Sequence, residues 1–118
     1  MTPKEFVVAL KSECRDSAVA GCLGDLQLPP GRKPAPELVK LSEWYLSLST
    51  DGQENVAAAM RQAADATLFG VLCVIDGVRA VEPVGAKSQF VLTAKRLGAE
   101  STISPGPDLL HDLLRAEL

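Results

Sequence analysis

A long apolar periodicity between Gln53 and Val81 constrains the fold of this chain more than any other feature. At 100° per residue, seven apolar side chains of this stretch fall within about 80° of one another. A helix from Gln53 to Asp76 would be about 36 Å long, whereas a compact domain of 118 residues has a radius of gyration of about 13 Å. We therefore predict a central helix that crosses the domain and turns one apolar stripe toward the core. The stripe consists of Ala57, Met60, Ala64, Leu68, Val71, Ile75 and Val78.

The C-terminal part of this stretch is apolar on every side, which is typical of an enclosed helix end. We expect Val71 to Ile75 to be helical and buried. The alternative is a β-hairpin, because this segment is rich in β-branched residues, Asp76-Gly77 is a strong turn signal, and Val78 to Val81 could be a returning strand. The regular, Ala-rich pattern before Leu68 favours the helix. Gly70 costs about 1 kcal/mol relative to Ala in a helix, and so indicates the close approach of another backbone.

Two shorter helices are predicted before the central one. Thr2-Pro3-Lys4-Glu5 combines a capping box with a proline at the first helical position, and it opens a helix that reaches about Leu23. The proline-rich stretch from Pro29 to Pro36 is an extended connection, and Pro36 begins the second helix. Because the turn after Ser47 is short, we expect the second helix to lie antiparallel to the central helix. Its apolar side consists of Leu38, Leu41, Trp44, Tyr45 and Leu48.

The pattern changes after Glu82-Pro83, where short strands replace the helical periodicity. Ser88 to Ala94 alternates between apolar and polar residues, and Glu100 to Ser104 is a second short strand, so the two form an antiparallel hairpin. A last helix follows, with an apolar stripe of four leucines. The sequence thus predicts one mainly α domain of the α+β class, with three packed helices around a long central helix, a two-stranded antiparallel hairpin and a C-terminal helix. The leucines of the last helix are Leu109, Leu110, Leu113 and Leu114.

Charge and composition limit the function classes that suit this chain. The net charge is −3 and the isoelectric point is near 5.1, which opposes nucleic acid as the main partner because phosphate binding needs a basic face. The apolar run Leu68 to Ile75 is far shorter than the ~20 residues that span a bilayer, and no signal peptide precedes the first helix. We expect a cytoplasmic protein with no membrane contact.

The three cysteines also argue against a disulfide or a metal centre. Cys14, Cys22 and Cys73 are odd in number and have no metal-ligand spacing. Cys14 and Cys22 would be about 12 Å apart along a helix, too far for a disulfide. All three lie among apolar residues, so buried free thiols in a reducing cytoplasm are expected. No glycine pattern matches a phosphate-binding loop or a dinucleotide fingerprint, and we predict no cofactor and no metal.

Five short motifs are spread over most of the chain: Cys22-Leu23, Pro29 to Arg32, Glu37 to Val39, Leu41 to Trp44 and Phe69 to Arg79. In combination they resemble a family of small bacterial proteins that are known only as uncharacterised. The resemblance implies a bacterial cytoplasmic origin. It implies no activity, cofactor or partner.

The single histidine, His111, is expected on the solvated flank of the last helix. Asp112 follows it directly, but neighbours at i and i+1 do not face each other on a helix. Any catalytic triad or histidine-based metal site would have to use this one residue. No catalytic residue is therefore predicted, and a non-enzymatic protein is favoured over an enzyme.

Two groups of residues remain as candidate binding sites. Asp76 and Arg79 are three residues apart and would share a helix face, so they predict either an ion pair that closes the central helix or, with Glu43, a polar cluster that binds a ligand. Trp44 is expected in the core, but aromatic and arginine residues are also typical of binding hot spots, and Trp44 with Arg32 would then mark a contact surface.

The leading hypothesis is a small protein-interaction module, such as an immunity-type inhibitor of a toxin or an adaptor, with another protein as partner and a homodimer compatible with the sequence. The alternative is a ligand-binding or enzymatic domain that uses Asp76, Arg79 and Glu43. A pocket that holds those three residues together would favour the second class. An apolar patch around Trp44 or the hairpin edge would favour the first.

Overall fold

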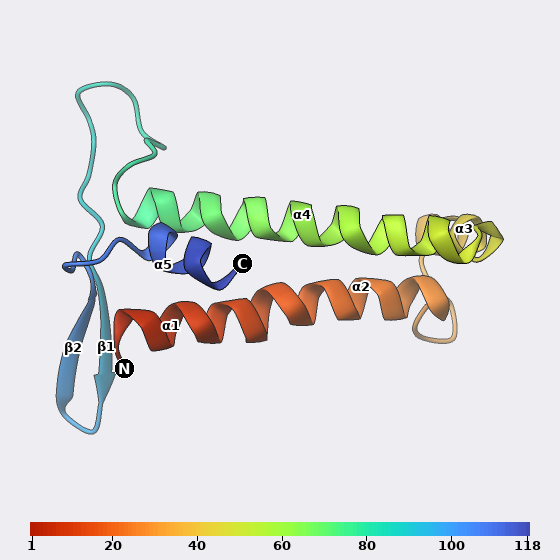
Figure 1. Ribbon diagram of the computed structural model, residues 1–118, viewed down its shortest axis with the longest axis horizontal. Helices are drawn as coiled ribbons and strands as arrows, with labels where there is room; N and C mark the ends of the chain where they lie inside the picture. The colour runs from red at the N-terminus through yellow and green to blue at the C-terminus, as the bar shows by residue number, and fades with distance from the viewer.

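Two long helices that lie side by side form the body of the protein in the computed structural model, which describes residues 1–118 (Figure 1). The first is a continuous rod of α1 (Pro3–Leu10), η1 (Lys11–Asp16) and α2 (Ser17–Gln27), and the second is α4 (Thr50–Ile75). They run antiparallel (Figure 1). The predicted fold class is confirmed. Its remaining elements are α3 (Pro36–Ser47), β1 (Leu92–Arg96), β2 (Ala99–Ser104) and α5 (Leu110–Glu117).

The predicted central helix is confirmed as α4, and the hairpin alternative is wrong. The Ser49 side chain caps its start, because its Oγ accepts a hydrogen bond from the Gly52 N–H at 3.1 Å. The helix continues through the β-branched segment and ends where Gly77 takes a positive φ of 78°. A glycine in this conformation commonly ends a helix, so the Asp76-Gly77 step is a helix stop rather than a hairpin turn.

The N-terminal rod begins as its sequence predicts. Thr2 Oγ1 accepts from the Glu5 N–H at 3.1 Å, and a Glu5 carboxylate oxygen accepts from the Thr2 N–H at 2.8 Å, which completes the capping box. The hydrogen bond from the Thr2 backbone lowers the pKa of Glu5, because it favours the ionised carboxylate. The rod is longer than predicted, because it reaches Gln27. It also includes one π-helical segment, Lys11–Asp16.

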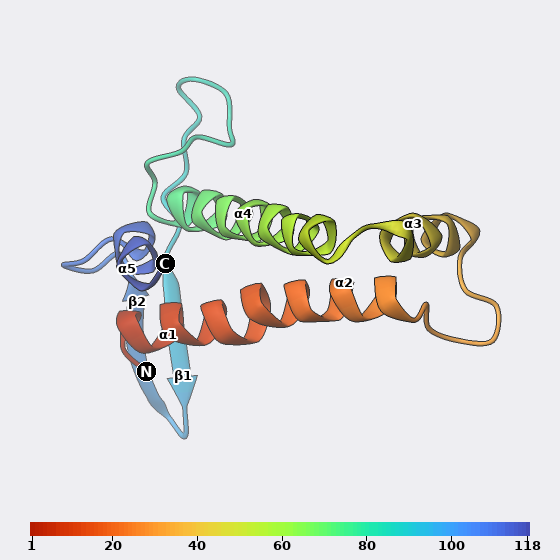
Figure 2. The same cartoon turned by 45° about the vertical axis from the view of Figure 1, so that its right-hand side comes forward.

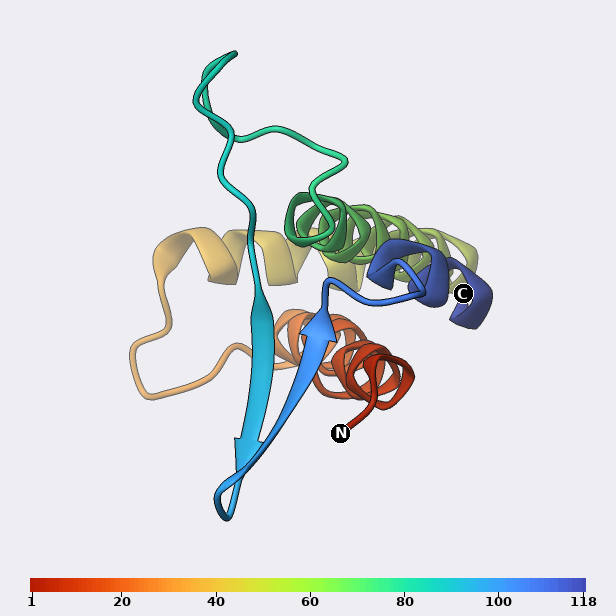
Figure 3. The same ribbon diagram turned by 90° about the vertical axis from the view of Figure 1, so that its left-hand side faces the viewer.

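The position of α3 corrects the predicted antiparallel arrangement. Figure 3 shows α3 crossing the two long helices at their far end and projecting to one side, while α5 lies on the opposite side of α4. The Ser42 hydroxyl fixes α3 against α2 by donating a hydrogen bond to the Leu26 carbonyl at 2.7 Å. Ser42, Tyr45 and Leu26 are buried at this contact.

The hairpin is confirmed, with a later start than predicted. β1 pairs antiparallel with β2, and Arg96 opposite Ala99 leaves a two-residue turn at Leu97-Gly98. Both turn residues have positive φ, 50° and 80°, as the tightest hairpin turns require. Ser88 stays outside the strand because its N–H and its hydroxyl both donate to the Glu82 carboxylate, at 2.7 Å and 2.8 Å.

The core lies at one end of the rods, where α1, α4, β2 and α5 converge (Figure 2). Its fully buried side chains form one cluster of five aliphatic residues. Both small terminal elements depend on this cluster, since a short helix and an isolated hairpin are marginal on their own. The cluster consists of Val7, Leu72, Ile103, Leu110 and Leu114.

Away from this end, the chain buries much less than predicted. Only 12 of 118 residues are buried, and the exposed area of 8121 Å² exceeds the about 6200 Å² typical of a compact monomer of this mass. The radius of gyration is 18.3 Å, against about 13.5 Å for a compact domain of this length. The predicted burial of Cys14 and Cys22 is wrong, because both thiols are exposed and only Cys73 is buried. The protein therefore carries a large uncovered surface.

The predicted burial of Val71 to Ile75 is correct for only part of the segment. Leu72 is fully buried and Cys73 nearly so, but Val71 is 50% exposed, and Val74 and Ile75 are half-buried. Periodicity places Val71 on the same face as Leu68 and Ile75, which pack against the core, but Val71 itself stays half exposed.

Two neighbouring truncations on α4 test this distribution of burial. Leu72→Ala should lower the free energy of unfolding by about 2–5 kcal/mol because it opens a cavity in the core. Val71→Ala, one residue away, should cost about 1 kcal/mol or less, because half of its side chain already contacts water. Urea unfolding of the two variants measures both values, and equal losses would contradict a core confined to the Leu72 side.

Candidate functional site

Asp76, the main site candidate from the sequence, holds α5 in place. Its carboxylate accepts hydrogen bonds from the backbone N–H groups of Leu110 and His111, at 3.0 Å and 2.9 Å. These are orphan donors at the start of α5, whose own N-cap residue Leu109 offers no side-chain cap. A carboxylate at this position also interacts favourably with the positive end of the helix dipole. Asp76 therefore caps a helix that follows it by more than thirty residues.

His111 is a partner of this cap rather than a solvated surface residue, so the expectation of a solvated histidine is wrong. Its Nδ1 lies 2.6 Å from Asp76 Oδ2, and its side chain is only 12% exposed, against 2% for Asp76. The Phe69 ring packs edge-on against the imidazole at a centroid distance of 5.5 Å. The Arg115 guanidinium lies over the Phe69 ring at 5.1 Å. Together these contacts hold α5 against α4.

Arg79 does not pair with Asp76, so the predicted ion pair is absent from the structure. Arg79 is exposed, and its guanidinium lies against Gly70 on α4. A Cβ atom on Gly70 would collide with this guanidinium. The close approach that Gly70 predicts is therefore real, but a side chain makes it instead of a backbone.

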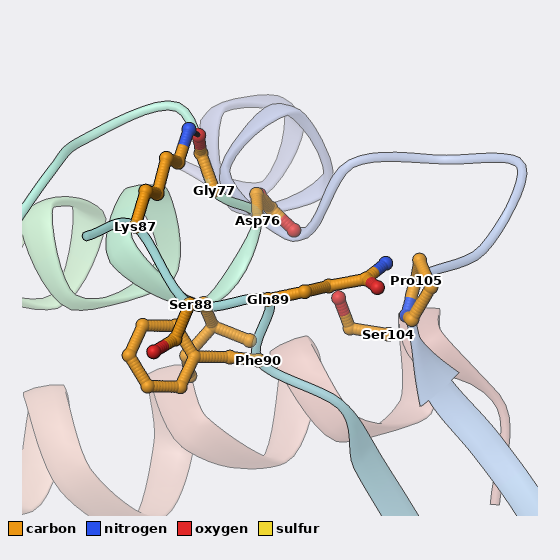
Figure 4. A pocket seen from close by; sticks show the side chains of 9 residues that line it. Asp76, Gly77, Lys87, Ser88, Gln89, Phe90, Ser104 and Pro105 are labelled. Carbon is orange, nitrogen blue, oxygen red and sulfur yellow. Dashed lines mark hydrogen bonds between the residues drawn. The ribbon is translucent and has the colours of Figure 1, made fainter. Parts of the chain in front are cut away.

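A small pocket of about 300 Å³ lies beside Asp76, between the end of α4 and the segment before β1 (Figure 4). Ser88 faces it but is held by Glu82, and the Lys87 ammonium donates to the Gly77 carbonyl at the rim. Both carboxylate oxygens of Asp76 are already occupied by α5. No serine or cysteine forms a hydrogen bond with His111, so the pocket lacks the nucleophile and base pair of covalent catalysis. The hydrogen bonds of Lys87 and Ser88 are contacts within the 77–88 loop and hold it beside the end of α4.

The other candidates lie at the far end of the molecule. Glu43 is on α3, beyond the start of α4, whereas Asp76 follows the end of α4 (Figure 1). The structure therefore does not bring Glu43, Asp76 and Arg79 together into one cluster. Arg32 is exposed in the loop that connects α2 to α3.

Trp44 is not part of the core, so its predicted core position is wrong. Trp44 is 50% exposed and Leu41 is 52% exposed, and the two are one helical turn apart on α3. Tyr45 next to them is buried. We call Leu41 and Trp44 the α3 edge. It lies on the helix that projects from the side of the molecule opposite α5 (Figure 3).

The predicted core stripe of α4 is partly covered, and two of its members, Leu68 and Ile75, pack against the aliphatic core. Phe69 marks the side of α4 that faces α5, and the stripe residues lie about 100° to 180° around the helix from it. Val71 is exposed and the other members are only half-buried. Phe90, itself 41% exposed, lines the pocket together with Ile75 at the end of the stripe. We call Ala57, Met60, Ala64, Leu68, Val71 and Ile75 the α4 stripe.

An ion pair between two partly buried side chains holds the two long helices together. Arg15 on η1 makes two hydrogen bonds to the Asp65 carboxylate, at 2.6 Å and 3.1 Å. These bonds raise the pKa of Arg15 above its ordinary value, because the carboxylate favours the charged guanidinium. The pair fixes the spacing of the helices where the aliphatic core does not reach.

By length and composition alone, α4 could cross a membrane, and 17% of its most apolar 18 residues are buried in this structure. Core helices of soluble proteins can meet the same criterion. Arg61 and Asp65 lie in the middle of α4, and Asp65 is already paired with Arg15. The expectation of no membrane contact stays a prediction.

Fold and site together define a small, mainly helical α+β protein with several half-exposed apolar side chains and no group of three or more potential metal ligands. No protein-family model, no curated protein and no solved structure matches this chain. The resemblance to small bacterial proteins therefore stays a prediction, and function has to be argued from the molecule itself.

The role of Asp76 as a cap for α5 can be measured directly. Asp76→Ala should destabilise the protein by about 2 kcal/mol, the upper part of the range for a lost N-cap, and should speed amide exchange at Leu110 and His111. Asp76→Asn should lose less, because its amide oxygen still accepts one bond. Glu54→Ala, a control that removes an exposed carboxylate near the other end of α4, should change neither quantity, and an unchanged exchange rate in Asp76→Ala would contradict the cap.

Proposed function

We propose that this protein is a small, non-enzymatic protein-interaction module that binds through Val71 on α4 and through the α3 edge. The observation that carries the proposal is the exposure of Val71, Leu41 and Trp44, each about half uncovered. Large exposed apolar patches on soluble proteins mark interaction sites. Tryptophan in particular is enriched among binding hot spots.

The polar candidate residues support the same conclusion, because the structure uses them for contacts within the chain. Asp76 and His111 bind each other and the start of α5, which leaves neither free to hold a substrate. Glu43 lies at the other end of α4. A structural role accounts for the strongest polar cluster, whereas Val71, Leu41 and Trp44 stay half exposed and can contact a partner.

The shape of the surface favours a protein partner. Val71 is a half-exposed aliphatic side chain on one helix, and Leu41 and Trp44 lie one turn apart on another, as do the apolar anchors of helix-mediated recognition. The net charge of −3 fits an adaptor or an immunity-type inhibitor of the bacterial cytoplasm. A basic partner would associate with such a protein faster than a neutral partner would.

Affinity capture from a lysate of the native cell tests this function with three tagged baits: wild type, Val71→Glu and Ala59→Glu. Val71→Glu places a charge in the stripe and should abolish capture of the partner, because an unpaired charge is costly in an apolar interface. Ala59→Glu adds the same charge at an exposed position on another face of α4 and should capture as wild type does. Identical captured proteins for all three baits would overturn the proposal.

A further inference from the structure

We propose that the pocket beside Asp76 binds a small neutral polyol of about the size of one monosaccharide. The groups that hold it are the Ser104 hydroxyl and the Gln89 carboxamide. This site goes beyond the proposed function, because the pocket adjoins the end of α4 that is opposite the α3 edge (Figure 1). Two polar groups that the fold does not use, and the balance of charge around them, point to this ligand.

Ser104, the last residue of β2, is a buried polar residue with an unpartnered hydroxyl. Its exposed fraction is 3%, and no residue of the chain forms a hydrogen bond with the hydroxyl. The other buried serine, Ser42, donates to the Leu26 carbonyl at 2.7 Å. Every fully enclosed polar side-chain atom of this protein has a hydrogen-bond partner, so the Ser104 hydroxyl opens into the pocket that Ser104 lines. A buried hydroxyl that stays unpaired costs stability, which indicates an occupant of the pocket that pairs with it.

Gln89 supplies a second unused polar group, from the segment before β1. Its side chain reaches across the pocket toward Ser104 and Pro105 (Figure 4). No residue of the chain forms a hydrogen bond with its carboxamide. The segment itself is fixed, since the preceding Ser88 makes two hydrogen bonds to the Glu82 carboxylate. The carboxamide is therefore held at the pocket without a role in the fold.

The charged groups of the pocket are already engaged, and their charges cancel. The Asp76 carboxylate is bound to the start of α5, and the Lys87 ammonium donates to the Gly77 carbonyl. The free hydroxyl and carboxamide are neutral, and each can donate and accept. A ligand hydroxyl also donates and accepts, whereas a carboxylate only accepts and an ammonium group only donates. A charged ligand would in addition lose hydration without gaining a free counter-ion.

The size and the apolar wall of the pocket suit one sugar ring. Its volume of about 300 Å³ is at the lower end of the range for ligand pockets. Ile75, Phe90 and Pro105 contribute apolar surface to the lining, against which the C–H groups of a ring can pack. A ligand of about 12 non-hydrogen atoms, with the efficiency typical of small molecules, should bind with a dissociation constant on the order of 1 mM.

A titration of the purified full chain, followed by amide proton–nitrogen correlation spectra, tests the ligand class. The neutral polyols are glucose, galactose and myo-inositol, and the matched probes are gluconate as an anion, glucosamine as a cation and acetamide as a neutral amide. At least one neutral polyol should shift the signals of Gln89 and Ser104 to saturation, and the three matched probes should bind more weakly. Tighter binding of a charged probe or of acetamide would overturn the assignment.

Two substitutions test the residues that hold the ligand. Ser104→Ala and Gln89→Leu should each raise the dissociation constant about 3- to 10-fold, as for one lost hydrogen bond. Ser101→Ala removes a hydroxyl of the same strand that donates to the Met1 carbonyl outside the pocket, and it should bind as wild type does.

The melting temperature without ligand distinguishes a binding group from a structural one. Ser104→Ala should melt at the same temperature as wild type or slightly above it, because it removes a buried hydroxyl that has no partner. A lower melting temperature would show that the hydroxyl is used by the fold, and would overturn the inference. Gln89 is exposed, so Gln89→Leu keeps the binding test valid in a folded protein.

The remaining outcomes separate this site from the proposed function. If no polyol binds, the pocket holds water only and the inference fails. Binding that withstands both Ser104→Ala and Gln89→Leu would place the ligand elsewhere and would also overturn it. The Gln89→Leu bait should still capture the protein partner, and Val71→Glu should still bind the polyol, so either proposal can fail without the other.

Discussion

Burial of Leu72 is the interaction on which the rest of this structure depends. Its side chain is fully enclosed by Val7, Ile103, Leu110 and Leu114, which come from α1, β2 and α5. None of the small elements could be stable alone, since α5 has 8 residues and isolated helices shorter than about 12–15 residues are marginal. Asp76, one turn after Leu72, then fixes the start of α5 by hydrogen bonds. Apolar burial and a polar cap thus act on the same helix end.

The other end of the molecule buries fewer side chains, and this difference is what supports a binding function. There the Arg15–Asp65 pair and the Ser42–Leu26 hydrogen bond set the positions of α4 and α3. Neither contact covers Val71 on α4 or Leu41 and Trp44 on α3, which stay about half exposed. Exposed apolar side chains of this size are common anchors of protein interfaces.

Local sequence signals determined the elements of this fold, but they did not determine what covers them. The capping box at Thr2 and the periodicity of α4 act within a few turns, so both were predictable from sequence. Periodicity also identified the α4 stripe, but it reports only which residues share a face. Whether Val71 or Trp44 is buried depends on distant segments, and for that reason both predictions of burial failed.

The candidate site was predictable only in part, for the same physical reason. Asp76 stood out because it follows an apolar run, but its partners lie 34 and 35 residues away in the sequence. An aspartate just after one helix, together with a later helix that lacks its own cap at Leu109, is the signal that could have revealed the pairing. The His111 contact follows from that cap and has no local signature.

Fluorescence of Trp44, the single tryptophan of the chain, tests the central claim most directly, because this side chain is half exposed and would be covered in a complex with a partner. The emission maximum of the isolated chain should be that of a tryptophan in contact with water, it should shift to shorter wavelength when the captured partner is added, and Val71→Glu should abolish the shift. An isolated chain that emits as a buried tryptophan does, or no shift when the partner is added, would contradict the account.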